Sequence, residues 1–205
     1  MRNQIIDKAT DLFLNFGFKS VTMDDIANAL GMSKKTIYSH FKNKSELVKA
    51  TTFNLFEVIS KKIEDIRVKK VNPIEEIYDI KHEVMDHLKN EKSSPQYQLQ
   101  KYYPEIHNEL KVKQFELMHT CVTDNLKRGM ALGVFRNNIN VDFLSKLYFY
   151  SLLNIRNTDH FPLKQNTLLD LIDQFYEYHL RGICTEVGLV VLDQFINKTL
   201  STHND

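Results

Sequence analysis

Residues 22–50 read TMDDIANALGMSKKTIYSHFKNKSELVKA, and this stretch decides the fold. Thr22 and Asp25 have the spacing of a capping box, in which the N-cap hydroxyl and an acidic side chain three residues later satisfy each other's backbone N–H groups. Gly31 is placed to end the helix that follows, and Ser33 to cap the next one. Two short helices joined by so tight a link are typical of a helix-turn-helix.

Amphipathic helices are expected on both sides of this stretch. Apolar residues recur at three- and four-residue steps over 3–16, and Gly17 follows as a stop. On the other side, Asn43 and Glu46 form a second predicted capping box, which opens a long helix over about 44–69. The later periodic segments predict helices over 74–90, 95–103, 105–131, 140–156, 165–181 and 186–200.

No run alternates apolar and polar residues for long enough to propose a strand. We therefore expect an all-α protein. Its N-terminal three-helix helix-turn-helix domain would span residues 1–48, and a long helix would join it to a helical domain over residues 49–205.

Charge and cysteine content narrow the class of protein. The chain of 205 residues has a formal net charge of only +1, but residues 1–50 hold eight Lys and Arg against five Asp and Glu, which favours a polyanion-binding N-terminal part. Cys121 and Cys184 lie far apart and suggest neither a disulfide framework nor a thiolate metal site. With no signal peptide and no apolar run of 18 residues, we expect a cytoplasmic protein that does not enter a membrane.

The third predicted helix has two distinct faces. At about 100° per residue, Ile37 and Phe41 fall on one side and form a stripe to be buried. Lys35, Thr36 and Ser39 then point away from that stripe. Their donors, hydroxyl groups and methyl group are the chemistry that reads base edges in the DNA major groove.

Residues on the edges of this face suit phosphate groups. Tyr38 and His40 fall on the two shoulders and carry polar tips. Ser33 and Lys34 lie at the positive N-terminal end of the helix, and Lys44 lies in the first turn of the next helix. A cation is disfavoured at a helix N-terminus, so a bound anion would explain Lys44. The alternative is an ordinary basic surface helix with no ligand.

In these residues the sequence resembles the DNA-binding domain of TetR-family transcriptional regulators. The resemblance is close over residues 3–50, and beyond them it is one of layout only. The residues that match the family pattern are Thr22, Ile26, Ala27, Gly31, Ser33, Tyr38, Phe41, Lys44 and Leu47.

The resemblance implies that the third helix enters the major groove. It implies phosphate contacts from the residues that match the family's phosphate-holding positions, which are Thr22, Tyr38, His40 and Lys44. Base contacts would then come from Lys35, Thr36 and Ser39. Many members have glycine where this chain has Lys35, so the bases that it reads do not follow from the family.

The resemblance also implies a homodimer on a palindromic double-stranded DNA operator. The last two long helices would pack against those of a second copy, through Leu144, Leu147, Ser151, Ile155, Leu168, Ile172, Phe175, Tyr176 and His179. Phe143 belongs to the same apolar stripe of the first of these helices. The alternative is that these stripes are buried within one chain.

A small-molecule effector is the third expectation that comes from the resemblance. Its pocket would lie among the helices over 50–155, which are rich in aromatic residues. The candidates are Tyr97, Tyr102, Tyr103, His107, Phe115, Met118, His119 and Phe149. Any one of them is equally an ordinary core or surface residue.

Other kinds of site are less well supported. Asp79, His82, Glu83 and Asp86 share a helix face, but acidic stripes of this spacing are usually solvated, so we predict no metal and no other cofactor. No Gly-rich phosphate loop or nucleophile elbow points to an enzyme. We predict a dimeric repressor that a small molecule releases from DNA; the alternative is a DNA-bound scaffold that recruits a protein partner.

Overall fold

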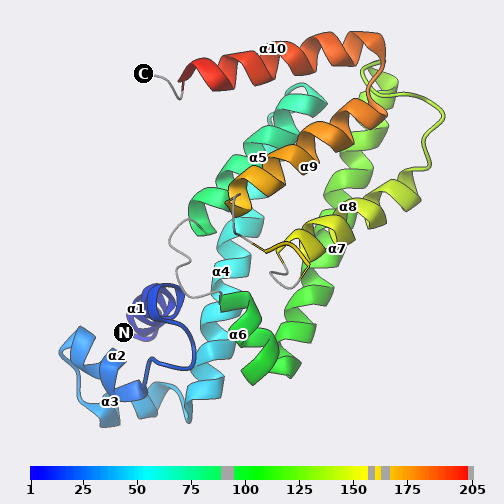
Figure 1. Ribbon diagram of the computed structural model, residues 1–205. Helices are drawn as coiled ribbons and strands as arrows, with labels where there is room; N and C mark the ends of the chain where they lie inside the picture. Colours follow the sequence, from blue (N-terminus) through cyan, green and yellow to red (C-terminus); the bar gives the residue numbers. More distant parts are fainter. Residues whose placement is uncertain (89–94, 157–159, 163–166, 203–205) are drawn as a thin grey trace. The chain divides into compact units, whose positions relative to one another are not determined.

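The computed structural model describes residues 1–88, 95–156, 160–162 and 167–202, with the side chains of 88, 95 and 197–202 left aside. In this part of the chain ten helices follow one another, and the β pairing consists of an isolated antiparallel bridge between Phe135 and Cys184 (Figure 1). The helices are α1 (Arg2–Phe16), α2 (Met23–Leu30), α3 (Lys34–His40), α4 (Lys44–Arg67), α5 (Pro73–Leu88), α6 (Pro95–Tyr102), α7 (Pro104–Ala131), α8 (Val141–Ile155), α9 (Leu168–Ile183) and α10 (Glu186–Thr202).

The all-α prediction is confirmed, and the helix boundaries fall within a few residues of those expected. Residues 89–90 and 165–166, which the periodicity assigns to helices, lie outside the described residues. None of the described helices is long and apolar enough to cross a membrane.

Local capping explains where the N-terminal helices begin. The predicted box at Thr22 and Asp25 is present: the Thr22 hydroxyl accepts the Asp25 N–H at 3.1 Å, and the Asp25 carboxylate accepts the Thr22 N–H at 2.8 Å. At the start of α4 the expected box differs in one contact. Asn43 accepts the N–H of Glu46 at 2.9 Å, but the Glu46 carboxylate accepts the N–H of Lys42, one residue earlier than predicted.

The chain packs as two compact units. The first comprises Met1–Ile63 and Glu83–Gln114, and the second comprises Glu64–His82 and Phe115–Asp205. The first unit is larger than the DNA-binding domain expected over residues 1–48, because Leu99, Ile106 and Leu110 of α6 and α7 are buried in the same core as α1, α2 and α3. Where the functional boundary between domains lies stays a prediction.

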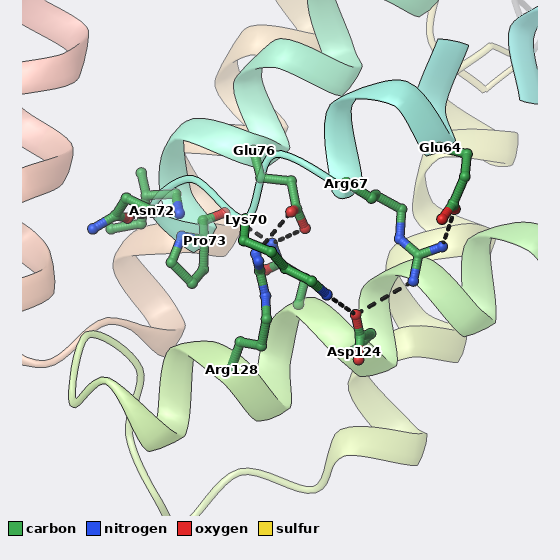
Figure 2. A network of polar contacts seen from close by, with 10 residues as sticks. Glu64, Arg67, Lys70, Asn72, Pro73, Glu76, Asp124 and Arg128 are labelled. Atoms are coloured by element: carbon green, nitrogen blue, oxygen red, sulfur yellow. Dashed lines mark hydrogen bonds and ion pairs between the residues drawn. The ribbon is translucent and has the colours of Figure 1, made fainter. Parts of the chain in front are cut away.

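Buried ion pairing joins helices within the second unit (Figure 2). Glu76 of α5 is 2% exposed, and its carboxylate accepts hydrogen bonds from Asn125 at 2.8 Å and Arg128 at 2.7 Å, both on α7. Asn125 also donates to the carbonyl of Pro73 at 2.9 Å. A buried carboxylate of this kind needs its partners, since an unpaired buried charge costs several kcal/mol.

The end of α4 joins the same region of the second unit. Arg67 donates to Glu64 at 2.6 Å and to Asp124 of α7 at 3.3 Å, and the ammonium group of Lys70 lies 3.8 Å from the same Asp124 carboxylate (Figure 2). The last turn of α4 and the start of α5 are thereby held against α7.

Helices α8 and α9 pack against each other through aromatic side chains. Tyr148 donates a hydrogen bond of 2.6 Å to the Tyr176 hydroxyl, and both side chains are buried. The ring of His179 lies 5.4 Å from that of Tyr148 and stacks on Phe175 at 5.5 Å. Burial lowers the pKa of His179 to about 4, so the folded chain holds this imidazole neutral.

The low pKa of His179 predicts a loss of stability in acid. The unfolded chain takes up the proton near pH 6.5, whereas the folded chain resists it down to about pH 4. The stabilisation is therefore complete above pH 6.5 and is lost as the pH falls toward 4, by on the order of 3 kcal/mol. Urea denaturation across this range should show a shallower pH dependence for His179→Phe than for the unmodified chain.

His160, which is exposed, provides the control for this measurement. The His160→Phe variant should keep the full pH dependence. Equal dependence in His179→Phe and the unmodified chain would contradict the assignment.

Candidate nucleic-acid interface

The burial of α3 agrees with the two faces expected from the sequence. Ile37 and Phe41 are both 0% exposed and belong to the core of the first unit. On the opposite side Lys35 and Ser39 are exposed and Thr36 is half-buried. A helix anchored by one apolar pair thus presents a lysine and two hydroxyl residues to solvent.

Hydrogen bonds within α3 determine what these outward residues still offer to a ligand. The Ser39 hydroxyl donates to the carbonyl of Thr36 at 2.7 Å, which leaves its oxygen as an acceptor. The Thr36 hydroxyl lies 2.8 Å from the hydroxyl of Ser33, the cap of the helix. Among the described residues no acceptor or carboxylate lies within bonding distance of the Lys35 ammonium group, which is therefore the free donor of this face.

The two shoulder residues differ in exposure. Tyr38 is 41% exposed. His40, in the last turn of α3, is half-buried. The structure thus places both predicted shoulders beside the outward face, with the tyrosine more open to a ligand.

Thr22 is more constrained than the sequence suggests. Besides capping α2, its hydroxyl donates to the Asp25 carboxylate at 2.8 Å, so its proton is already in use. The hydrogen bonds from the Thr22 backbone and side chain lower the pKa of Asp25 and keep it ionised. A phosphate group at Thr22 would have to share this hydroxyl with a carboxylate.

The lysines near the interface fall into two groups. The Lys34 ammonium group lies 2.8 Å from the carboxylate of Asp24 and links α3 to α2, and this hydrogen-bonded pair raises the pKa of Lys34. Lys44 has no carboxylate within 4.0 Å among the described residues. Its ammonium group instead donates to the carbonyl of Lys19 at 3.5 Å, and partial burial lowers its pKa.

The α1–α2 loop is the part of this region that sequence reasoning missed. The backbone of Lys19 bonds Lys44 through its carbonyl and Gln98 of α6 through its N–H, at 3.0 Å. Gln98 is 79 positions away along the chain, so no local sequence pattern could have indicated it.

The predicted effector residues divide between the two units. In the first, Tyr97 and Tyr102 are 57% and 39% exposed, Tyr103 packs edge-on to Phe18 at 6.1 Å, and His107 is buried, which lowers its pKa. In the second, the ring of Phe115 lies 5.5 Å from His119 and 5.2 Å from Phe149, while Met118 is half-buried. The candidates thus form two clusters of aromatic residues, one in each unit, and the effector pocket stays a prediction.

The predicted dimer residues also divide by burial. Ile155, Ile172, Tyr176 and His179 are buried within the single chain, and their part in a dimer stays a prediction. Leu144, Ser151, Leu168 and Phe175 are half-buried, and Leu147 is 43% exposed.

On the same face of α8 as Leu147, Phe143 is 59% and Tyr150 is 48% exposed. The open part of the stripe is therefore carried by Phe143, Leu147 and Tyr150. Tyr150 is the member that the sequence pattern did not assign to the dimer.

Comparison with known proteins identifies the N-terminal part. Residues 5–51 match the family described as bacterial regulatory proteins, tetR family. The chain is 36% identical over 56 residues to the biofilm operon icaADBC negative transcriptional regulator IcaR of Staphylococcus epidermidis, which is 27% of this chain and 30% of IcaR. It is 23% identical over 150 residues to the transcriptional repressor KstR2 of Mycolicibacterium smegmatis, which is 70% of this chain and 71% of KstR2.

Solved structures show that the likeness in fold extends over the body. SmeT, the repressor of the Stenotrophomonas maltophilia multidrug efflux pump SmeDEF, superimposes with a TM-score of 0.67 at 16% identity and covers 91% of each chain. A SmeT–triclosan complex gives 0.68 at 16% identity, over 90% of this chain and 92% of SmeT. At this level of identity the likeness concerns the fold alone.

The capping box at the start of α2 predicts a measurable loss of stability. Thr22→Ala removes the hydroxyl that accepts the Asp25 N–H and should lower the free energy of unfolding by about 1 kcal/mol in urea denaturation. Thr22→Ser keeps the hydroxyl and should stay close to the unmodified chain. An equal loss in both variants would show that the stabilisation comes from the methyl group and not from the cap.

Proposed function

Because this chain belongs, by its N-terminal domain, to the tetR family of bacterial regulatory proteins, we propose that it is a DNA-binding transcriptional repressor. Proteins of this family are transcriptional regulators and not enzymes. The observation that carries the proposal is the burial of Ile37 and Phe41, which turns Lys35, Thr36 and Ser39 outward on the third helix of a helix-turn-helix. The chain would act in the cytoplasm, where its DNA lies.

The outward residues would read base edges in the major groove. Lys35 supplies a free cationic donor, suited to the O6 and N7 acceptors of guanine. Ser39 supplies an acceptor, and Thr36 supplies a methyl group and a hydroxyl. Tyr38, His40 and Lys44 would hold phosphate groups on either side, together with Ser33 and Lys34 at the start of α3 and Thr22 at the start of α2.

Two copies of the chain would bind one operator. A single helix-turn-helix makes few contacts, and dimers of such proteins read two half-sites about one helical turn or a multiple of it apart. The exposed apolar residues Phe143, Leu147 and Tyr150 on α8 support a contact with a second copy, since three such side chains on one helix face are costly to leave in water.

A small molecule would release the repressor from DNA. The SmeT–triclosan complex shows a small molecule bound to a protein of similar fold, which supports a ligand in this body as well. The effector must bind the conformation that cannot hold DNA more tightly than the one that can, and a coupling of about 1–3 kcal/mol is typical.

Selection of bound sequences from a random double-stranded DNA pool tests the function directly. We expect enrichment of a palindromic consensus, because a symmetric dimer reads two inverted half-sites. Enrichment of an asymmetric single site would contradict the dimer. No enrichment at all would contradict DNA binding.

Single substitutions on α3 separate the two kinds of DNA contact. Tyr38→Ala should weaken binding to all sequences alike, whereas Lys35→Ala or Thr36→Ala should relax preference at one or two base pairs, by about 1–3 kcal/mol each. Fluorescence anisotropy with the consensus and its single-base variants measures both effects. Tyr38→Phe keeps the ring and therefore measures the contribution of the hydroxyl group to the affinity for DNA. A change in base preference with unchanged overall affinity in Tyr38→Ala would reverse the assigned roles.

A further inference from the structure

Helix α6 holds the loop between α1 and α2 through one side chain. The amide oxygen of Gln98 accepts the backbone N–H of Lys19 at 3.0 Å. The amide group also lies directly against Gly17, where a β-carbon would overlap it. Gly17 has a φ of 83°, a backbone conformation that favours glycine. A side chain at this position would therefore strain the backbone as well as overlap the Gln98 amide group.

Apolar contacts hold the same loop beside this hydrogen bond. Phe18 is 6% exposed, and its ring lies 5.0 Å from Phe13 of α1 and 6.1 Å from Tyr103, just after α6. Leu99, next to Gln98, is 3% exposed in the same core. The loop is therefore packed between α1 and the end of α6, and its backbone has little freedom to move without α6.

The carbonyl of Lys19, in the next peptide group of the loop, faces a proposed DNA contact. The carbonyl of Lys19 accepts a hydrogen bond of 3.5 Å from the Lys44 ammonium group, in the first turn of α4. At this length the bond is weak and contributes little to stability. Asp25 attracts the Lys44 ammonium group without forming an ion pair within 4.0 Å, so the Lys19 carbonyl is the hydrogen-bond acceptor that the described residues provide for this charge.

We propose that Gln98 is a positioning residue for DNA binding, which holds Lys44 on a DNA phosphate group by fixing the backbone of the α1–α2 loop at Lys19. The inference rests on the proposed function, since it requires Lys44 to bind DNA. It extends the DNA-binding machinery to α6, outside residues 5–51 that carry the family match. The affinity for DNA is then set partly by a helix that makes no contact with DNA itself.

The first experiment compares two glutamines of α6. Gln98→Met keeps the length of the side chain but removes the acceptor, and Gln100→Met makes the same change at an exposed position of the same helix. Anisotropy with the selected operator should show an affinity about 3- to 10-fold weaker for Gln98→Met, because the contact of Lys44 with a phosphate group is weakened, and unchanged for Gln100→Met. Gln98→Ala should follow Gln98→Met. Unchanged affinity in both Gln98 variants would overturn the proposal.

A double-mutant cycle with Lys44→Ala distinguishes positioning from a general loss of structure. If Gln98 acts through Lys44, Gln98→Met should change affinity less than about 2-fold in the Lys44→Ala background. Lys44→Ala should also reduce the dependence of log affinity on log salt by about one phosphate contact, and Gln98→Met by part of one. An equal effect of Gln98→Met in both backgrounds would overturn the proposal.

Two controls keep the result interpretable. In the unmodified chain the Lys19 amide should exchange its hydrogen slowly, as a bonded loop amide does, and rapid exchange would overturn the proposal without any substitution. Failure of the unmodified chain to bind any DNA would instead contradict the proposed function. The two failures are therefore distinguishable.

Discussion

The candidate nucleic-acid interface depends on the burial of Ile37 and Phe41 in the core of the first unit. Both side chains are fully buried, and this alone sets the rotation of α3 about its axis. A rotation by one residue, about 100°, would bring an apolar side chain to the surface and turn Lys35 toward the core. Burying an unpaired ammonium group costs more free energy than a few new packing contacts provide. The core therefore allows α3 one orientation about its axis. The outward position of Lys35, Thr36 and Ser39 is a consequence of that packing.

Residues of α6 and α7, far from α3 in the sequence, also contribute to the packing of the first unit. Leu99, Ile106 and Leu110 complete the core on which α3 rests, and Gln98 bonds the loop that precedes α2. The core on which the three N-terminal helices pack is thus shared with α6 and α7. Two hydrogen bonds of the Lys19 backbone, one to Gln98 of α6 and one to Lys44 of α4, connect these helices through the α1–α2 loop.

In the second unit, hydrogen bonds and ion pairs between polar side chains join the helices. Glu76 is buried with Asn125 and Arg128, and Arg67 lies between Glu64 and Asp124. Nothing in the local sequence distinguishes Glu76 from the solvated acidic residues around it, because its burial is created by α7, some 50 positions later. The burial of His179 also depends on distant residues, because its ring lies against Tyr148 of α8 as well as Phe175 of its own helix.

The sequence by itself determined the helices, their caps and the inward face of α3, because these follow from interactions within a few residues: the box at Thr22 and Asp25, the stop at Gly31, and the spacing of Ile37 and Phe41. Local spacing did not determine which face of α8 and α9 is buried, because an apolar stripe can pack equally well on its own chain or on a second copy. Nor could it reveal the contact of Gln98 with Lys19, or the burial of Glu76 against Asn125 and Arg128 of α7. Those depend on distances between atoms that only the folded chain brings together.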